Sequence, residues 1–281
     1  MSRRVDLGPG LDVIGRVGDG GGGRVFIVWN QRAWCPMACK VFSSPGRAQR
    51  EAAVLEALDH PNIVRFFGRG RPDTILMEYL DGPTLSDVIR TRRRRRLSVS
   101  NAVRMAIHLG AALTHVHARG FVHLDVKPSN VIVAVGRPVL FDFSSARPRT
   151  DEPLGHPSGT DAYMAPEQCR GERVTSAADV FGLGATLYEA LTGRLPFPAG
   201  TRRHPFTQLT TSPIPLRRLA PEVPVGLERL VSACLARDPA DRPSALEALL
   251  PQLHTFIRTG PRMWPVNVEP GSAVLAGRKL A

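Results

Sequence analysis

The pattern of apolar positions divides the chain into a strand-rich first part and a mainly helical second part. In the first 80 residues, short apolar runs separated by glycine, proline and polar residues predict strands. The glycine cluster between the first two runs predicts a hairpin, and residues 47–58 carry apolar side chains at helical spacing. The predicted strands cover residues 13–15, 25–28, 37–42, 63–67 and 74–80.

Residues 81–83, Asp-Gly-Pro, break this pattern and predict a hinge. Beyond the hinge, a short hairpin is expected at residues 130–143, and residues 144–166, rich in Ser, Thr, Pro and Gly, predict a loop. Helices are predicted at residues 99–117, 177–191, 227–236 and 244–257. The chain is therefore expected to be α+β, with a leader, a strand-rich unit, a helical unit and a loosely ordered tail at residues 1–10, 11–80, 81–257 and 258–281.

The composition of this 281-residue chain fits a globular protein of the cytoplasm. Hydrophobic residues make up 43% of it, and none of its four cysteines forms a Cys-x-x-Cys pair, so we expect a sizeable core and reduced thiols. No apolar stretch reaches the length of a membrane span. The formal net charge of +12 has two open interpretations, an attraction to polyanions and a compositional bias of the source.

The most informative chemical pattern is His-Leu-Asp-Val-Lys-Pro-Ser-Asn at residues 123–130. It contains a carboxylate at Asp125, an ammonium at Lys127 and a carboxamide at Asn130, and Asp142 follows twelve residues later. An aspartate that takes a proton, a lysine that neutralises phosphate and an Asn/Asp pair that holds metal are what phosphoryl transfer requires. Lys127 is one of three lysines among 37 Lys and Arg residues, which indicates that a compact ammonium is needed there.

A second pattern lies in the strand-rich part. Residues 18–25 fit G-x-G-x-x-G-x-V, in which glycines let backbone N–H groups approach phosphate. Alone this is weak evidence, because glycine-rich turns are common. Lys40, on a later predicted strand, is placed to reach the same phosphates, and Glu51 on the predicted helix is its natural anionic partner. The alternative is that Lys40 and Glu51 are ordinary surface charges.

With these patterns in hand, the sequence resembles the eukaryotic-type (Hanks-type) Ser/Thr protein kinase family, in the compact form found in bacteria. The resemblance covers residues 11–257 and implies a bilobal protein kinase fold, with a small antiparallel β-rich N-lobe holding one helix and a larger, mainly α-helical C-lobe. All motifs occur in the family's order, which is highly specific. They are the glycine loop at residues 18–25, Ala38-Cys39-Lys40, Glu51, residues 60–64, the Asp125 loop, Asp142-Phe143-Ser144, Ala165-Pro166-Glu167, residues 179–184 and Asp241-Arg242-Pro243.

The resemblance implies a role for each polar residue in transferring the γ-phosphoryl group of ATP to a protein hydroxyl. Lys40, paired with Glu51, would hold the α- and β-phosphates. Asp125 would orient the acceptor hydroxyl and take its proton, and Lys127 would lie against the γ-phosphate. The implied ligands of Mg²⁺, with Mn²⁺ as an alternative ion, are Asn130 and Asp142.

The resemblance also implies an ATP pocket at the hinge. The backbone of residues 78–80 would meet the adenine, and apolar side chains would sandwich the ring. The implied nucleotide-binding residues are Gly18, Gly20, Gly23, Val25, Ala38, Lys40, Met77, Glu78, Leu80 and Ile132.

The implied acceptor is a serine or threonine of a protein substrate. Residues 127–130 resemble Ser/Thr rather than Tyr kinases, and Thr160 matches the threonine that contacts the aspartate and the lysine in Ser/Thr kinases. Residues 144–166 correspond to the activation segment of the family. An ion pair between Glu167 and Arg242 is expected to tie this segment to the large lobe.

Two positions depart from the family pattern. Leu124 stands where the family has an arginine that binds a phosphate on the activation segment, so we expect activity that does not depend on segment phosphorylation through this contact. Ser144 stands where the family has glycine, and serine reaches positive φ less freely, so the segment is expected to flip less easily or to lie closer to its active form. Asp179 is expected to hold the backbone around His123.

Two other functions and one further surface were considered. A nucleotide-binding pseudokinase or scaffold is disfavoured because all the transfer residues are present, and a small-molecule kinase is disfavoured by the full-length activation segment. The arginine run from Arg90 to Arg96 predicts either a solvated loop, which we favour, or a grip on an acidic partner. Nucleic acid is not an expected partner, because the tryptophans form no stacking stripe.

Overall fold

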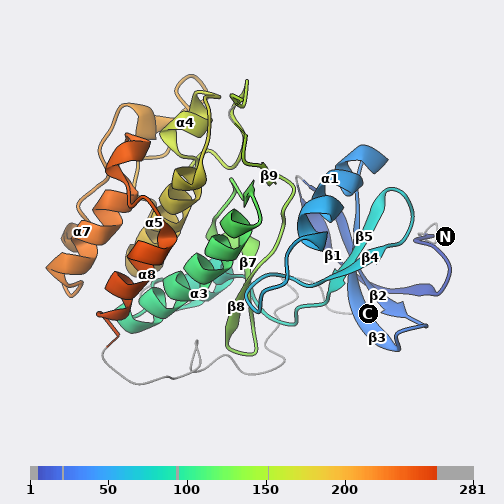
Figure 1. Ribbon diagram of the computed structural model, residues 1–281. Coiled ribbons are helices and arrows are strands. Elements are labelled where there is room, and N and C mark those ends of the chain that lie inside the picture. The colour runs from blue at the N-terminus through green and yellow to red at the C-terminus, as the bar shows by residue number, and fades with distance from the viewer. Residues whose placement is uncertain (1–5, 21, 93–94, 151, 258–281) are drawn as a thin grey trace.

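The strand-rich part of the chain forms one five-stranded antiparallel sheet with a single helix, and the helical part forms a larger second lobe (Figure 1). This computed structural model describes residues 6–20, 22–92, 95–150 and 152–257. The predicted tail at residues 258–281 and the first five residues of the predicted leader lie outside the described residues. So do Gly21 of the glycine loop and two members of the arginine run, Arg93 and Arg94.

The sheet of the small lobe has the strand order β1-β2-β3-β5-β4. The helix α1 (Pro45–Glu56) follows the third strand, and it begins with proline at a position where the missing N–H costs nothing. Its buried face packs toward the sheet through Ala48, Ala52 and Leu55. The strands are β1 (Leu11–Gly20), β2 (Gly23–Asn30), β3 (Cys35–Val41), β4 (Phe66–Arg69) and β5 (Thr74–Glu78).

The predicted strand at residues 63–67 is displaced in the structure. The strand β4 begins only at Phe66, and the apolar residues before it pair with the other lobe. Ile63 forms a bridge with Leu140, and the Val64 amide donates to the Leu140 carbonyl. Apolar character alone did not reveal which sheet these residues join, because β pairing depends on tertiary context.

The large lobe is built around two long helices, α3 (Val99–Ala118) and α5 (Ser176–Thr192). Ser98 caps α3 by accepting a hydrogen bond from the Asn101 amide, and α5 ends at Gly193 with φ of 71°. The other helices are α2 (Leu85–Thr91), α4 (Pro166–Cys169), α6 (Leu216–Leu219), α7 (Val225–Cys234) and α8 (Leu246–His254). The short strands are β6 (Phe121–Val122), β7 (Val131–Ala134), β8 (Arg137–Leu140) and β9 (Arg147–Pro148), and the 3-10 turns are η1 (Pro128–Asn130), η2 (Thr207–Leu209) and η3 (Pro239–Asp241).

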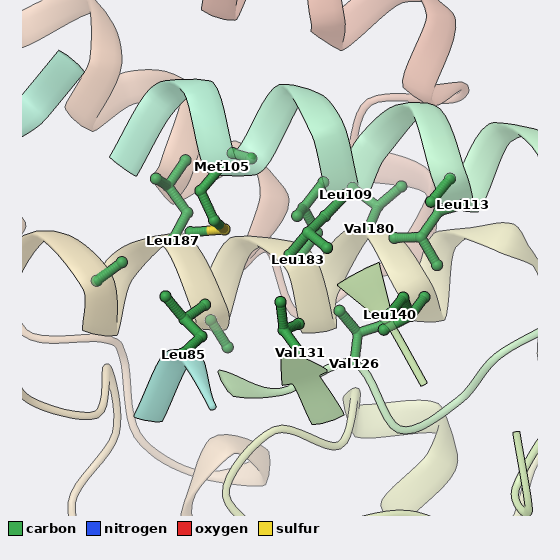
Figure 2. Close-up of a cluster of buried hydrophobic side chains, with 14 of the residues drawn as sticks. Leu85, Met105, Leu109, Leu113, Val126, Val131, Leu140, Val180, Leu183 and Leu187 are labelled. Atoms are coloured by element: carbon green, nitrogen blue, oxygen red, sulfur yellow. The ribbon is translucent and has the colours of Figure 1, made fainter. Parts of the chain in front are cut away.

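The core of the large lobe anchors residues 123–130, which we call the catalytic loop. Figure 2 shows leucines and Met105 of α3 meeting leucines of α5, with Val126 and Val131 pointing into the same cluster. These two valines flank the polar side chains of Lys127 and Asn130. Burial of each valine stabilises the fold by about 1.5–3 kcal/mol, so the hydrophobic effect holds the loop in its middle and directly after its last residue.

The two lobes are joined by contacts as well as by the hinge at residues 81–83. The Asn62 side chain donates to the Pro138 carbonyl at 2.8 Å, and the Leu140 amide donates to the Asn62 carbonyl at 2.8 Å. Arg137, in β8, donates to the Pro61 carbonyl and to the Glu78 carboxylate. In the described part of the chain, no helix has both the length and the apolar character needed to cross a membrane.

Candidate active site

An ammonium and two carboxylates meet where the small lobe faces the large one. The Lys40 Nζ lies 2.8 Å from both carboxylate oxygens of Glu51 and 2.7 Å from the Asp142 Oδ1. The pairing expected between Lys40 and Glu51 is therefore present. This pair joins β3 to α1. Asp142, which lies two residues after the end of the β7–β8 hairpin, adds a contact from the large lobe.

Lys40 and Glu51 lie in a nearly dry environment, at 4% and 2% exposed, whereas the Asp142 side chain is 24% exposed. Burial alone would lower the pKa of Lys40, but the carboxylates of Glu51 and Asp142 outweigh burial and raise it. Burial would likewise raise the pKa of Asp142, but the Lys40 ammonium and hydrogen bonds to Lys40 and Ser144 hold it at about 2. The site thus keeps a fixed positive charge beside a fixed negative one.

The Asp125 carboxylate is the centre of a second polar cluster. Thr160 Oγ1 donates to Asp125 Oδ1 at 2.7 Å, and Lys127 Nζ donates to Asp125 Oδ2 at 2.8 Å. Lys127 Nζ also contacts Thr160 Oγ1 at 2.5 Å. The Asn130 amide nitrogen donates to the Asp125 Oδ2 and to the Asp125 carbonyl, each at 2.9 Å. A residue of the activation segment, Thr160, is thereby joined to the catalytic loop.

The backbone of the catalytic loop is held in an unusual conformation by Asp179 of α5. Asp179 Oδ2 accepts from the His123 amide and Oδ1 accepts from the Leu124 amide, each at 2.8 Å. Leu124 has φ of 64°, a region that a leucine enters only at a cost of about 1–3 kcal/mol. Burial would raise the pKa of Asp179, but hydrogen bonds from His117 and His123 lower it, so a buried carboxylate stays charged and fixes the strained turn.

His123 connects the two polar clusters. Its Nδ1 accepts from the Asp125 amide at 3.2 Å, and its ring meets the Phe143 ring edge-on with centroids 4.7 Å apart. Burial lowers the pKa of His123, which keeps the ring neutral and suits this accepting nitrogen. Asp125, Asp142 and Lys127 all lie within electrostatic reach of this one ring. His123 therefore lies near charged groups of both clusters.

The glycine loop closes over the first cluster. Gly18 lies on β1 opposite Val25, and the hairpin turns between Gly20 and Gly23. A Cβ at Gly22 would lie 2.7 Å from Lys40 Nζ, a distance that real side chains do not show. Among the described glycines of the loop, Gly22 is the one that lies against Lys40, and the motif spacing did not single it out because it lies in a run of four glycines.

The apolar residues expected to meet adenine lie next to this glycine loop and the hinge. Val25, Ala38 and Ile132 are each partly exposed, although residues beside each of them are buried. Ala38 pairs with Met77 across β3 and β5, so the strand register places the two side chains next to each other on the same face of the sheet. The Glu78 amide already donates to the Arg65 carbonyl, so this amide is not available to a base.

Asn130 and Asp142 fit a magnesium ion held mainly by phosphates. The Asn130 amide nitrogen is occupied by Asp125, which leaves the amide oxygen as the ligand atom. Among residues 6–20, 22–92, 95–150 and 152–257, no three His, Cys, Asp or Glu side chains gather into a metal-binding cluster. Mg²⁺ commonly takes only one or two protein oxygens and fills its other positions with phosphate and water.

The end of the activation segment is tied to the large lobe by a buried ion pair. Arg242 Nη1 and Nη2 meet the two oxygens of Glu167 at 2.7 and 2.8 Å, in the two-pronged geometry typical of strong Arg–carboxylate pairs. Arg242 also donates to the carbonyls of Ala177 and Ala236. The expected contact is therefore present, and removal of either partner would leave a buried charge at a cost of about 3–5 kcal/mol.

Arg90 and Arg96, two described members of the arginine run, have their ion-pair partners outside this site. Arg90 pairs with Asp87, and Arg96 pairs with Glu222 at 2.9 Å and donates to the Leu219 carbonyl. These partners belong to the same chain, which agrees with the interpretation as an ordinary connecting loop. The acidic partner at this run stays a prediction.

Two residues of the activation-segment region were missed by sequence reasoning. Gln168 and Gln208 are buried amides that donate to backbone carbonyls of the segment, and Gln168 also donates to the Leu124 carbonyl of the catalytic loop. Gln168 directly follows the Ala-Pro-Glu motif, so proximity to the motif was the one available signal. Gln208 lies in the short turn η2, about 40 residues after the segment in sequence, where nothing in the pattern indicated it.

Known proteins match this chain along most of its length. The family model described as protein kinase domain matches residues 11–253. The serine/threonine-protein kinase pkn3 of Myxococcus xanthus is 31% identical over 289 residues, covering 92% of this chain and 52% of that protein. The serine/threonine-protein kinase PkaA of Streptomyces coelicolor is 38% identical over 214 residues, covering 71% of this chain and 38% of that protein.

The chain thus spans about half the length, or less, of these curated relatives. A solved structure, the kinase domain of PknI from Mycobacterium tuberculosis, superposes with a TM-score of 0.71 at 27% identity, covering 91% of this chain and 99% of that one. The motifs, the two-lobed fold and these matches agree with one another. The chain belongs to the protein kinase domain family.

Proposed function

We propose that this chain is an ATP-dependent protein kinase that phosphorylates serine or threonine hydroxyls. The observation that carries the proposal is the Asp125 carboxylate, which accepts hydrogen bonds from Thr160, Lys127 and Asn130 at 2.7–2.9 Å. An acceptor hydroxyl placed against this carboxylate gives up its proton there, while Lys127 offsets the charge of the transferred phosphoryl group. The two relatives named serine/threonine-protein kinases, at 31% and 38% identity, support the same assignment.

Each remaining polar residue has a proposed task in this reaction. Lys40, held by Glu51, binds the α- and β-phosphates, and its fixed ammonium needs no reorganisation during transfer. Asn130 and Asp142 hold Mg²⁺, which supplies positive charge to the phosphates when bound. The glycine loop, with Gly22 against Lys40, presents backbone N–H groups to the same phosphates.

The class of substrate and the cellular compartment of the protein are proposed on separate grounds. Thr160, in contact with both Asp125 and Lys127, favours a serine or threonine acceptor on a protein, because this is the arrangement of Ser/Thr kinases. The four cysteines are free thiols, which supports a reducing, cytoplasmic setting. We assign the N-lobe to residues 11–80 and the C-lobe to residues 81–257, with the hinge between them.

The proposal is tested by transfer of radiolabelled phosphate from ATP to generic basic and acidic proteins, with Asp125→Asn as the matched control. The amide keeps the size of the carboxylate but accepts a proton poorly, so transfer should fall by about 10²–10⁴-fold. Label on serine and threonine that disappears in the control is the expected result. Nucleotide binding without transfer in the wild type would indicate a pseudokinase or scaffold instead.

A further inference from the structure

Two uncharged side chains hold the activation segment against the catalytic loop. The Gln168 Nε2 donates to the Leu124 carbonyl and to the Ser158 carbonyl, each at 2.8 Å, and its Oε1 accepts from the Ala165 amide at 3.0 Å. Gln168 is 1% exposed. One buried amide group therefore bridges the residue before Asp125 and a residue two positions before Thr160.

Gln208 makes a similar connection from a different part of the chain. Its Nε2 donates to the Asp161 carbonyl at 2.7 Å and to the Met164 carbonyl at 3.0 Å. Gln208 is 3% exposed and lies in η2, which packs against α4. Figure 1 shows the chain that follows α5 passing beside α4 at the top of the large lobe. The backbone just after Thr160 is thereby fixed by a residue of another segment.

The backbone around Thr160 is shaped to accept these bonds. Gly159 has φ of 129°, and a Cβ there would lie 2.7 Å from the Leu124 carbonyl oxygen and 3.2 Å from the Gln168 Nε2. Only glycine allows the segment to approach the catalytic loop this closely. Together the two glutamines hold four carbonyls of residues 124, 158, 161 and 164.

The arrangement explains how the segment is ordered beside Leu124. Leu124 is 3% exposed and belongs to the apolar core, so its side chain offers no charge to an anion. Buried amides that donate to carbonyls are satisfied without any added group, and their loss would leave buried acceptors unpaired. The connection is therefore built into the sequence and needs no phosphate.

We infer that Gln168 and Gln208 are positioning residues that fix residues 158–164, and through them the Thr160 hydroxyl and the protein-substrate seat, by uncharged hydrogen bonds. The inference rests on the proposed kinase function, because it assigns a task in that reaction. Neither glutamine contacts the reacting atoms. They act through the backbone of the segment, whereas nucleotide binding depends on Lys40 and the glycine loop.

The test uses Gln168→Met and Gln208→Met in the full chain. Methionine keeps the length and approximate volume of glutamine but donates no comparable hydrogen bond, so packing is retained while the connection is lost. Gln252→Met is the matched control, because Gln252 is exposed and donates only within its own helix, to the Ala248 carbonyl. The readouts are kcat and KM for a peptide acceptor, KM for ATP, and hydrogen exchange of the amides in residues 158–164.

We expect kcat/KM for the peptide to fall by at least about tenfold in each variant, since two hydrogen bonds to carbonyls are lost. KM for ATP should stay within about twofold, because the nucleotide residues are untouched. Exchange should rise in residues 158–164 and not in α3 or α5. Gln252→Met should match the wild type in every readout.

Equal loss of peptide and ATP kinetics, or faster exchange throughout the lobe, would show that the glutamines only stabilise the fold and would overturn the inference. Unchanged exchange in residues 158–164 would overturn it as well. The exchange measurement requires no phosphoryl transfer. A wild type that transfers no phosphate therefore refutes the proposed function, while the exchange result still decides whether the glutamines fix the segment.

Discussion

Thr160 is the residue at which the activation segment and the catalytic loop meet. Its hydroxyl donates to Asp125 at 2.7 Å and accepts from Lys127 at 2.5 Å, so it takes part in two charge-assisted hydrogen bonds. Such bonds are stronger than neutral ones, and they hold both charged side chains in one orientation. A change at Thr160 therefore tests the geometry of the transfer site without removing either charge.

We predict that Thr160→Val lowers kcat for a peptide substrate by about 10–100-fold, because a hydrogen bond to a charged group is lost on each side. Thr160→Ser keeps the hydroxyl and should stay within about threefold of the wild type. The comparison is made by steady-state kinetics at saturating ATP. Equal activity of the serine and valine variants would contradict the role given to this hydroxyl.

The positive φ of Leu124 is also explained by contacts of single residues. Its amide and carbonyl are both engaged, by Asp179 and Gln168, and its side chain is buried in the core. These contacts over-determine the strained backbone, which is how such conformations persist at functional sites. The identity of Leu124 was visible in the sequence, but its backbone conformation and its partners were not.

At the scale of elements, the activation segment is held at several points along its length. Leu154 and Gly155 donate backbone hydrogen bonds to Glu172 and Gly171, and Tyr163 donates to Glu189 at 2.5 Å. Burial raises the pKa of the Tyr163 phenol, and the neighbouring Glu189 raises it further, so the donor stays protonated. All of these contacts form without a phosphate on the segment.

We therefore predict that a variant with Ser144, Ser145, Thr150 and Ser158 all changed to alanine keeps peptide kinase activity within about threefold of the wild type. The physical reason is that Leu124 cannot bind a phosphate, while side chains and backbone already order the segment. The measurement is the initial rate with a peptide substrate, and mass spectrometry establishes the phosphorylation state of both proteins. Loss of nearly all activity would refute the expectation drawn from Leu124.

Elements with strong periodicity were predictable from the sequence, and those shaped by tertiary contacts were not. The helices α3 and α5 begin and end within a residue or two of expectation, because an apolar face and caps specify them locally. The prediction for β4 began too early because it included Ile63 and Val64. These apolar residues pair with Leu140 of β8 and do not join the sheet of the small lobe. The turn η2 carries Gln208, a buried polar residue that no periodic pattern indicates.

At the scale of the whole molecule, two histidines lie where the lobes meet. His60 follows α1 in the small lobe and His115 lies on α3, with ring centroids 5.6 Å apart. His115 Nε2 accepts from the Asp59 amide at 3.2 Å, and His60 Nδ1 accepts from the Asn62 amide at 3.1 Å. Both rings must be neutral at these nitrogens in order to accept.

Burial lowers the pKa of both rings. The pKa of His60 is lowered further by His115 and His108, and that of His115 by Arg119, while Asp59 acts in the opposite direction on both. As pH falls, these histidines therefore bind protons at a higher pH in the unfolded chain than in the folded chain. Stability is fully present above the ordinary histidine pKa of 6.5 and is lost as pH falls below it through the lowered pKa of each ring.

We predict that the free energy of unfolding decreases between pH 7.5 and pH 5.5, and that His115→Gln makes the decrease smaller. Glutamine can still accept from the Asp59 amide but carries no proton in this range. Urea unfolding at the two pH values measures the difference, with His204→Gln on the exposed surface as the control. A pH dependence that is the same in all three proteins would exclude His115 as its source.

The residues of the candidate site come from distant parts of the chain, and the sequence indicated their chemistry better than their arrangement. The motifs predicted that Lys40, Asp125 and Asp142 would meet, because their order and spacing resemble one family. The close approach of Gly22 to Lys40 and the backbone contacts of Gln168 depend on how the lobes and the segment pack. Packing at this scale is set by the whole fold and has no local pattern.

The most direct test is calorimetric titration with a non-hydrolysable ATP analogue and Mg²⁺. We predict that the wild type binds, that Lys40→Met weakens binding by at least about tenfold through loss of a charged contact, and that Asp142→Asn removes the dependence on Mg²⁺. Asp125→Asn should change affinity by no more than about twofold, because the role proposed for Asp125 is toward the acceptor hydroxyl and not the nucleotide. A wild type that does not bind the analogue, or a Lys40→Met protein that binds it equally well, would contradict the claim that these residues form one nucleotide site.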